Sequence, residues 1–261
     1  MLVRFLHFKS IDSTNAQAKR FANPSVGGGD FGPLWLSADC QTAGKGRRGR
    51  DWMSDTGNLF CTGLYPHEGT PMSAARLSFA AALAVAQTLD AYIGPDLTTI
   101  KWPNDVYVGG KKICGILLET GTHQDESWVL VGIGINLVSS PDFEDYQTTH
   151  LLEHIAPSLL EGAEPVFTGA QPVLAILAQR FDHWRNIYLA QGFAPLRQAW
   201  LERAQGIGGV VTVRLPNTVI EGIALGMDED GALEVQVNAG PDSGKCVKIH
   251  AGDVFFPPSA L

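Results

Sequence analysis

The spacing of apolar residues along the chain predicts many short strands and a few helices. Continuous or alternating apolar runs bounded by turn residues are typical of strands. They predict strands at 2–8, 34–38, 59–64, 97–101, 106–108, 113–119 and 128–137. Gly109 and Gly110 separate two of these runs and predict a hairpin, because a type I′ turn needs a positive φ at both of its central residues.

Apolar residues repeated four apart predict the helices. Leu77, Ala81, Val85 and Leu89 form one such stripe, and Thr70-Pro71 before it is a typical helix start because proline suits the first helical position. The same reasoning predicts helices at 16–21, 172–189 and 194–205, with residues 12–15 as candidate caps of the first. Residues 139–170 show no regular pattern.

The pattern changes after Gly206. Short β-rich runs at 210–215, 219–227, 233–237 and 247–249 predict a small β domain of about 50 residues. We therefore expect two domains, 1–206 and 207–261. In the first, strands occur in adjacent runs and helices are grouped, which favours an α+β fold with a mixed or antiparallel sheet flanked by helices.

Composition narrows the classes of function. The net charge is −8 and the pI about 5.3, which argues against indiscriminate nucleic-acid binding because that relies on many contacts from Lys and Arg to phosphates. The N-terminus lacks a signal-peptide pattern, and the longest apolar run, 79–86, is shorter than the roughly 20 residues of a membrane span. These features predict a cytoplasmic protein without membrane contact.

Residues 41–52 are the most informative stretch. Glycines at 44, 46 and 49 alternate with Lys45, Arg47, Arg48 and Arg50. Glycine lets backbone N–H groups approach an anion, and arginine adds two-pronged recognition of phosphate or carboxylate oxygens. The pattern is not a Walker loop, because Gly44-Lys45 is followed by glycine rather than Ser or Thr. The alternative is a solvated basic turn.

A second stretch is Lys101-Trp102-Pro103-Asn104-Asp105, followed by Lys111-Lys112. A lysine at the end of one strand and another at the start of the next could place two ammonium groups over one pocket. The alternative is a turn with a solvated hairpin tip. A third stretch, 131–137, places Gly132 and Gly134 in a buried strand, where another group must come close. Asn136 ends that strand and is a candidate ligand or cap.

Together these stretches resemble the biotin–protein ligase family closely. The residues that carry the resemblance are Ser13-Thr14-Asn15, 44–52, 101–105, Lys112 with Gly115-Ile116-Leu117, and 132–136, in the family's order and spacing. The resemblance covers essentially the whole chain. It implies a fold like that of class II aminoacyl-tRNA synthetases and biotin ligases, with a small C-terminal SH3-like β-barrel. The chain begins directly at the ligase part, so we expect the stand-alone form without an N-terminal DNA-binding domain.

The resemblance also implies a reaction in two steps. The biotin carboxylate attacks the α-phosphorus of Mg-ATP and gives biotinyl-5′-AMP and pyrophosphate. A lysine of a biotin carboxyl carrier protein then attacks the mixed anhydride and expels AMP. The implied small molecules are biotin, ATP and Mg²⁺, and the implied partners are the carrier domain and, as in some relatives, a second copy of the chain.

The resemblance implies roles for single residues. Arg47 and Lys112 are expected to be catalytic. The residues expected to bind biotin are Ser13, Thr14, Asn15, Gln41, Lys45, Gly46, Arg47, Lys112 and Gly115, and those expected to bind ATP or the adenylate are Arg47, Arg50, Trp52, Lys101, Asn104, Asp105, Lys112 and Asn136. No protein metal ligands are expected. Lys45 stands where the family usually has arginine. A single ammonium group there replaces the planar guanidinium, and we expect a modest effect on ligand binding.

Three other functions compete with this one. Lipoate or octanoate–protein ligases and transferases share the fold and also acylate carrier lysines. His150-Leu151-Leu152-Glu153-His154 matches the H-x-x-E-H pattern of zinc metallopeptidases, which needs both imidazoles on one helix. The third is a non-catalytic module that binds through the β domain.

Overall fold

The computed structural model describes residues 3–123, 126–143, 146–155 and 165–256. Its main feature is a seven-stranded sheet with the order β1-β2-β3-β7-β6-β5-β4. The strands are β1 (Arg4–Ile11), β2 (Leu34–Gln41), β3 (Leu59–Pro66), β4 (Thr98–Lys101), β5 (Asp105–Val108), β6 (Lys111–His123) and β7 (Glu126–Ile135). β1 and β2 are parallel, whereas the other neighbouring pairs are antiparallel. The sheet is therefore mixed and the fold is α+β, as predicted.

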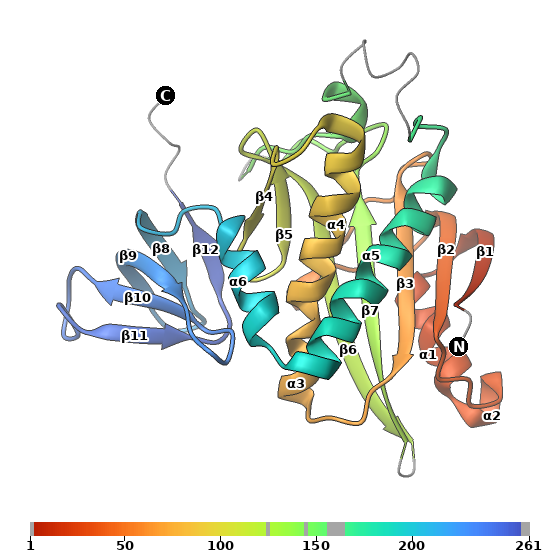
Figure 1. Cartoon of the computed structure of the whole chain (residues 1–261), viewed down its shortest axis with the longest axis horizontal. Helices are drawn as coiled ribbons and strands as arrows, with labels where there is room; N and C mark the ends of the chain where they lie inside the picture. The colour runs from red at the N-terminus through yellow and green to blue at the C-terminus, as the bar shows by residue number, and fades with distance from the viewer. Residues whose placement is uncertain (1–2, 124–125, 144–145, 156–164, 257–261) are drawn as a thin grey trace.

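Helices cover both faces of this sheet. They are α1 (Thr14–Ala22), α2 (Pro24–Gly27), α3 (Pro71–Ala75), α4 (Leu77–Ile93), α5 (Ala170–Gln191) and α6 (Ala194–Glu202), with short 3₁₀ helices η1 (Arg47–Gly49) and η2 (Leu151–Glu153). α4 and α5 lie over one face (Figure 1), and α1 packs on the other. Because strand side chains alternate between faces, Trp35 packs against Phe181 of α5 while Leu34 and Leu36 pack with Ala18 of α1.

α4 is more deeply buried than a single apolar stripe requires. Leu77, Ala81, Val85 and Leu89 are buried as predicted, but so are most of the residues between them. The helix lies between the sheet and α5 and α6, and a helix enclosed in this way is apolar all round. Residues Pro71–Ile93 are long and apolar enough to cross a membrane, because an 18-residue window within them has a mean hydropathy of 1.3. However, 67% of that window is buried inside this fold.

The ends of several elements differ from prediction. Gly109 and Gly110 have φ values of 57° and 75°, which confirms the predicted hairpin turn. α1 begins at Thr14, earlier than expected. α6 ends at Glu202 instead of continuing to 205, because the backbone beyond it pairs with β4: Ile100 N donates to the Arg203 carbonyl and Gln205 N donates to the Ile100 carbonyl, both at 2.8 Å.

The C-terminal strands form a second, antiparallel sheet beside β4 and α6, at the opposite end of the molecule from β1 (Figure 1). Its strands are β8 (Val210–Arg214), β9 (Val219–Met227), β10 (Leu233–Val237), β11 (Cys246–Ile249) and β12 (Asp253–Phe255), in the order β11-β10-β9-β8-β12. β12 was not predicted from the sequence. Over the described residues the order is an open series, so closure into an SH3-like barrel stays a prediction.

Candidate functional site

One cavity of about 830 Å³ gathers the three informative stretches of the sequence. Its walls come from the start of α1, the end of β2, the loop around η1, the turn between β4 and β5, the middle of β6 and β7, and β12. The predicted site residues that line it are Ser13, Thr14, Asn15, Gln41, Lys45, Gly46, Arg47, Arg50, Trp52, Lys101, Asn104, Asp105, Lys112 and Gly115. Asn136 is the predicted residue that does not line the cavity.

One end of the cavity carries a network of neutral polar groups. The Thr14 backbone N–H and hydroxyl donate to Gln41 Oε1 at 2.8 and 3.2 Å. The hydroxyl of Thr62, a fully buried residue of β3, lies 2.8 Å from Thr14 Oγ1 and 2.5 Å from Asn15 Oδ1. This network presents amides and hydroxyls without net charge, which suits a neutral polar group of a ligand.

Glu119 of β6 fixes the side chain of Asn15. Asn15 Nδ2 donates to Glu119 Oε2 at 2.9 Å, and Lys19 Nζ lies 2.6 Å from Glu119 Oε1. A carboxylate accepts and cannot donate, so this contact turns the Asn15 amide nitrogen toward Glu119 and its oxygen toward Thr62. Glu119 and Thr62 were not predicted as site residues, because their apolar strands show no signal that points to the pocket.

The glycine- and arginine-rich loop forms a small closed structure. Lys45 and Asp51 make an isolated antiparallel bridge, and Gly46 N donates to the Arg50 carbonyl at 2.7 Å. Within the loop, Arg48 has a φ of 56° and Gly49 a φ of 73°. A left-handed conformation at a residue other than glycine is uncommon. The two left-handed residues let the chain turn tightly enough to place Arg47 and Arg50 on the same cavity.

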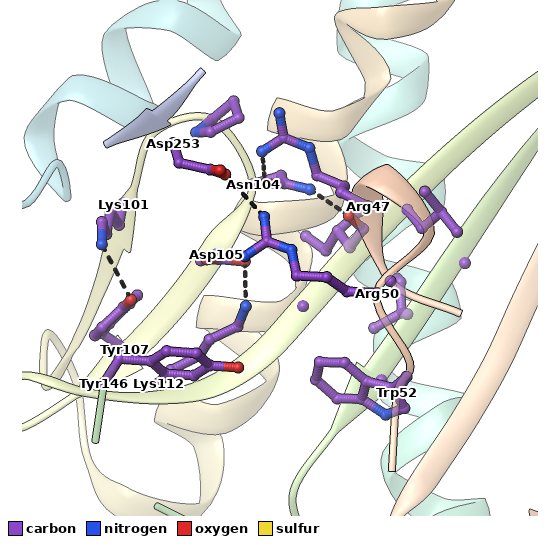
Figure 2. A pocket seen from close by; sticks show the side chains of 18 of the residues that line it. Arg47, Arg50, Trp52, Lys101, Asn104, Asp105, Tyr107, Lys112, Tyr146 and Asp253 are labelled. Carbon is purple, nitrogen blue, oxygen red and sulfur yellow. Dashed lines mark hydrogen bonds and ion pairs between the residues drawn. The ribbon is translucent and has the colours of Figure 1, made fainter. Parts of the chain in front are cut away.

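Arg47 is held by Asn104. Arg47 Nη1 donates to Asn104 Oδ1 at 3.1 Å, and Asn104 Nδ2 in turn donates to the backbone carbonyl of Ile116 on β6 (Figure 2). Burial lowers the pKa of Arg47, and the nearby carboxylates of Asp105 and Asp253 oppose that shift. Arginine stays charged throughout the physiological range, so a fixed and partly desolvated cation faces the cavity.

Two lysines and an aspartate lie beside Arg47. Lys112 Nζ forms an ion pair with Asp105 Oδ1 at 2.8 Å, and Lys101 Nζ donates to Tyr107 Oη at 3.4 Å (Figure 2). Burial lowers the pKa of Lys101, the nearby charge of Lys112 lowers it further, and Asp105 opposes the shift. The expectation that two ammonium groups share one pocket is therefore met, and an anion between them would offset their repulsion.

The strand glycines make room for side chains of the site. Gly115 and Gly134 are paired across β6 and β7, and a Cβ at Gly134 would lie 2.4 Å from Trp52 Cε2. A Cβ at Gly115 would lie 2.8 Å from Trp52 Cζ3. The sequence predicted a close approach at this strand, and the structure identifies the approaching groups as the indole of Trp52 and, at Gly132, the amide of Asn15.

Asn136 holds a neighbouring segment in place. Its buried side chain donates to the Thr149 carbonyl at 3.1 Å, and its own carbonyl accepts from Leu151 N. A direct contact with a ligand stays a prediction for this residue. The segment it supports brings Tyr146 to the cavity, where Lys112 Nζ lies 5.5 Å from the Tyr146 ring centroid.

The H-x-x-E-H stretch does not form the helix that a zinc peptidase requires. Residues Leu151–Glu153 are a single 3₁₀ turn with His150 and His154 on either side of it. Glu153 Oε1 lies 3.0 Å from His150 Nδ1, and His154 Nε2 lies 2.7 Å from Thr149 Oγ1. Within the described ranges there is no group of three or more His, Cys, Asp or Glu residues that could hold a metal ion.

The cavity thus combines two chemical environments. Neutral donors and acceptors lie at one end, and the cations Arg47, Arg50, Lys101 and Lys112 lie at the other. Such an arrangement suits a ligand with a neutral polar ring at one end and a carboxylate at the other, placed next to phosphates. It can hold two anions together and stabilise the charge that develops when they react.

Comparison with known proteins agrees with this chemistry. Residues 8–136 match the model of the Biotin/lipoate A/B protein ligase family, and residues 206–256 match that of the biotin protein ligase C terminal domain. The chain is 38% identical to a biotin–[acetyl-CoA-carboxylase] ligase of Paracoccus denitrificans, over 94% of this chain and 97% of that protein. It is 35% identical to the bifunctional ligase/repressor BirA of Bacillus subtilis (strain 168), over 94% of this chain and 71% of that protein.

The fold agrees as well. The biotin protein ligase from Aquifex aeolicus in complex with biotin and ATP is similar with a TM-score of 0.75 and 24% identity, over 98% of this chain and all of that one. The similarity to the Paracoccus protein extends over nearly the whole of both chains, and the two family models match successive parts of the sequence. This chain therefore belongs to the biotin–protein ligase family.

Proposed function

We propose that the cavity joins biotin to AMP and then transfers biotin to a lysine of a carrier protein. The chain is a biotin–protein ligase, and its small-molecule substrates are biotin and ATP. The observation that carries the assignment of the site is the presence of an uncharged polar network and a cluster of fixed cations in one cavity. Biotin has a neutral ureido ring at one end and a carboxylate at the other, which matches this division.

The contacts support specific roles. The ureido ring would meet Ser13, Thr14, Asn15 and Gln41, with Lys45, Gly46 and Gly115 along the rest of the biotin site. Arg47 would hold the carboxylate beside the α-phosphate, and Arg50, Lys101 and Lys112 would neutralise the phosphates. Trp52, Asn104 and Asp105 would complete the adenylate site, where Asn104 would act by holding Arg47. Asn136 would act through the segment that it holds beside the cavity. Because the protein supplies only position and charge, the reaction needs no covalent enzyme intermediate.

Magnesium would enter with ATP. The carboxylates nearest the cations are engaged, Asp105 with Lys112 and Asp253 with Arg48 and Arg50. Mg²⁺ commonly keeps several waters and binds through substrate phosphates together with one or two carboxylates. The described residues fit a mode in which phosphates and water supply the ligands better than a closed protein cage. The ion would neutralise phosphate charge.

ATP–pyrophosphate exchange by the purified protein tests the assignment. We expect exchange with biotin and none when lipoate or octanoate replaces it. Those acids lack a ureido ring, so Thr14, Asn15 and Gln41 would be left without a ligand group to bind. A preference for lipoate or octanoate would overturn the choice of substrate. Absence of exchange with all three acids would overturn the adenylation step itself.

The acceptor and the assembly extend the proposal. The acceptor would be a lysine of a biotin carboxyl carrier domain. The proposed second domain, 207–261, would receive it beside the cavity, and the described strands β8 to β12 support this assignment. The proposed location is the cytoplasm, where carboxylases would be acceptors.

The proposed homodimer would use the free edge of the sheet at β1, where Phe5 and Leu6 are 48% and 39% exposed. Light scattering on the purified protein tests the dimer.

Substituting Gly132 by alanine should raise the KM for biotin about tenfold and change the KM for ATP little. The new Cβ would lie 2.3 Å from Asn15 Oδ1, and Asn15 cannot move without losing its contacts with Thr62 and Glu119. Overpacking of this kind costs about 1–3 kcal/mol. A tenfold change in KM corresponds to about 1.4 kcal/mol, which lies within that range. Steady-state exchange kinetics measure both constants.

A matched glycine controls for backbone effects. Gly226 lies in β9, and a Cβ there would have nothing within 4 Å, so Gly226→Ala should behave as the unmodified protein. An unchanged KM for biotin in Gly132→Ala would show that Asn15 does not contribute to the biotin site.

A further inference from the structure

Asp253 connects the glycine- and arginine-rich loop to the C-terminal sheet. Its Oδ2 lies 2.8 Å from Arg48 Nη1 and its Oδ1 lies 2.8 Å from Arg50 Nη2. One carboxylate thus engages two arginines of the loop, across more than 200 residues of sequence. Asp253 lines the cavity, and Figure 2 shows Arg50 directed toward it. Among the described residues these are the ion pairs between this loop and the C-terminal sheet.

The carboxylate is presented by a well-packed element. Asp253 begins β12, which pairs with β8 so that Asp253 lies opposite Arg214. Val254, the next residue, is 4% exposed. On the other side, a Cβ at Gly252 would come within 3.0 Å of Val213 Cγ1. Asp253 is therefore placed by the packing of the C-terminal sheet, independently of the loop that it contacts.

The position of Asp253 is unfavourable for phosphate binding unless the carboxylate has another role. The cavity would bind ATP, and a carboxylate that lines it repels phosphates. Its pairs with Arg48 and Arg50 neutralise it, but they also engage Arg50, which the proposed function assigns to the phosphates. Arg48 does not line the main cavity, so it can stay with Asp253 when Arg50 turns to the nucleotide.

We propose that Asp253 is a positioning residue that fastens the loop 44–52 over the bound adenylate, with Arg48 as its permanent partner and Arg50 shared with the phosphates. This inference rests on the proposed function. The C-terminal sheet then controls how long biotinyl-AMP is retained, because the loop can open only when the pairs with Asp253 break. Retention matters because a mixed anhydride that escapes is lost to water.

Asp253→Asn tests the proposal with little change of shape. Each partly exposed ion pair is modest, so the loss of both should raise the rate at which preformed biotinyl-AMP dissociates by about fivefold, or about 1 kcal/mol. Trypsin gives a second readout that needs no ligand, because Arg47, Arg48 and Arg50 are cleavage sites within the loop. Cleavage there, mapped by mass spectrometry, should also be about fivefold faster in the variant.

Two comparisons separate a specific contact from a general loss of stability. Asp242→Asn removes an exposed ion pair with Lys245 near the same sheet and should change neither rate. In a double-mutant cycle, Arg48→Gln combined with Asp253→Asn should be no worse than Asp253→Asn alone. Urea unfolding shows whether each variant is folded.

The outcomes are distinct from those that test the proposed function. If Asp253→Asn retains biotinyl-AMP and resists trypsin like the unmodified protein, the proposal is wrong. Additive effects of Arg48→Gln and Asp253→Asn would also overturn it. Failure of biotin-dependent exchange in the unmodified protein would instead overturn the proposed function, while the trypsin comparison would still report whether Asp253 fastens the loop.

Discussion

Replacing Arg47 with alanine is expected to lower the rate of biotin-dependent ATP–pyrophosphate exchange about 10²–10³-fold, or about 3–4 kcal/mol of transition-state stabilisation. Arg47 is partly desolvated and is fixed by Asn104, which itself donates to the Ile116 carbonyl of β6. A preorganised cation of this kind stabilises charge that develops at phosphorus without having to reorganise. The loss should appear mainly in kcat, because the contact is expected to strengthen as the carboxylate bonds to the α-phosphate.

Two variants control this measurement. Arg47→Lys keeps the charge but loses the two-pronged geometry and the fixed plane, so its exchange rate should lie between those of alanine and arginine. Arg4→Ala removes an exposed arginine of β1 that pairs with Asp30 and should leave exchange unchanged. An Arg47→Ala protein that exchanges within about threefold of the unmodified rate would show that the cation is not used in the transition state.

The chemistry of the site could be predicted from sequence because its residues occur in short, distinctive runs. The glycines interleaved with arginines at 44–50 and the run Lys101-Trp102-Pro103 are unusual in an acidic chain, and residues of both runs line the cavity. The close approach at Gly132 and Gly134 was also predictable, since glycine weakens the interior of an apolar strand and often marks a place where another group comes close.

Contacts that depend on the tertiary fold could not be predicted. The sequence does not say that Trp52 is the group over Gly115 and Gly134, because the pairing of β6 with β7 brings those glycines together. Glu119 reaches Asn15 across 104 residues, and Asp253 reaches Arg48 across 205. Neither acid stands in a run that differs from an ordinary strand. Their roles follow only from where the strands place them.

A second large effect concerns stability: Arg203→Ala should lower the free energy of unfolding by about 3 kcal/mol. Arg203 Nη1 lies 2.6 Å from Asp90 Oδ2, and the Asp90 side chain is only 8% exposed. Removing the guanidinium would leave a buried carboxylate with Thr98 as its remaining side-chain partner. The lower end of the usual range for buried pairs applies because Arg203 is itself 18% exposed. Urea unfolding with linear extrapolation measures the change.

The same arginine offers its own control, because Nη2 lies 3.3 Å from Asp96 Oδ1 and the Asp96 side chain is 86% exposed. Asp96 has a φ of 61°, which asparagine tolerates, so Asp96→Asn should change the free energy of unfolding by no more than about 0.5 kcal/mol. Adding Asp90→Asn to Arg203→Ala should recover part of the loss, since a neutral amide costs less to bury than a carboxylate. If Arg203→Ala and Asp96→Asn were equally stable, the buried ion pair between α4 and the end of α6 would contribute no more to the core than the exposed one.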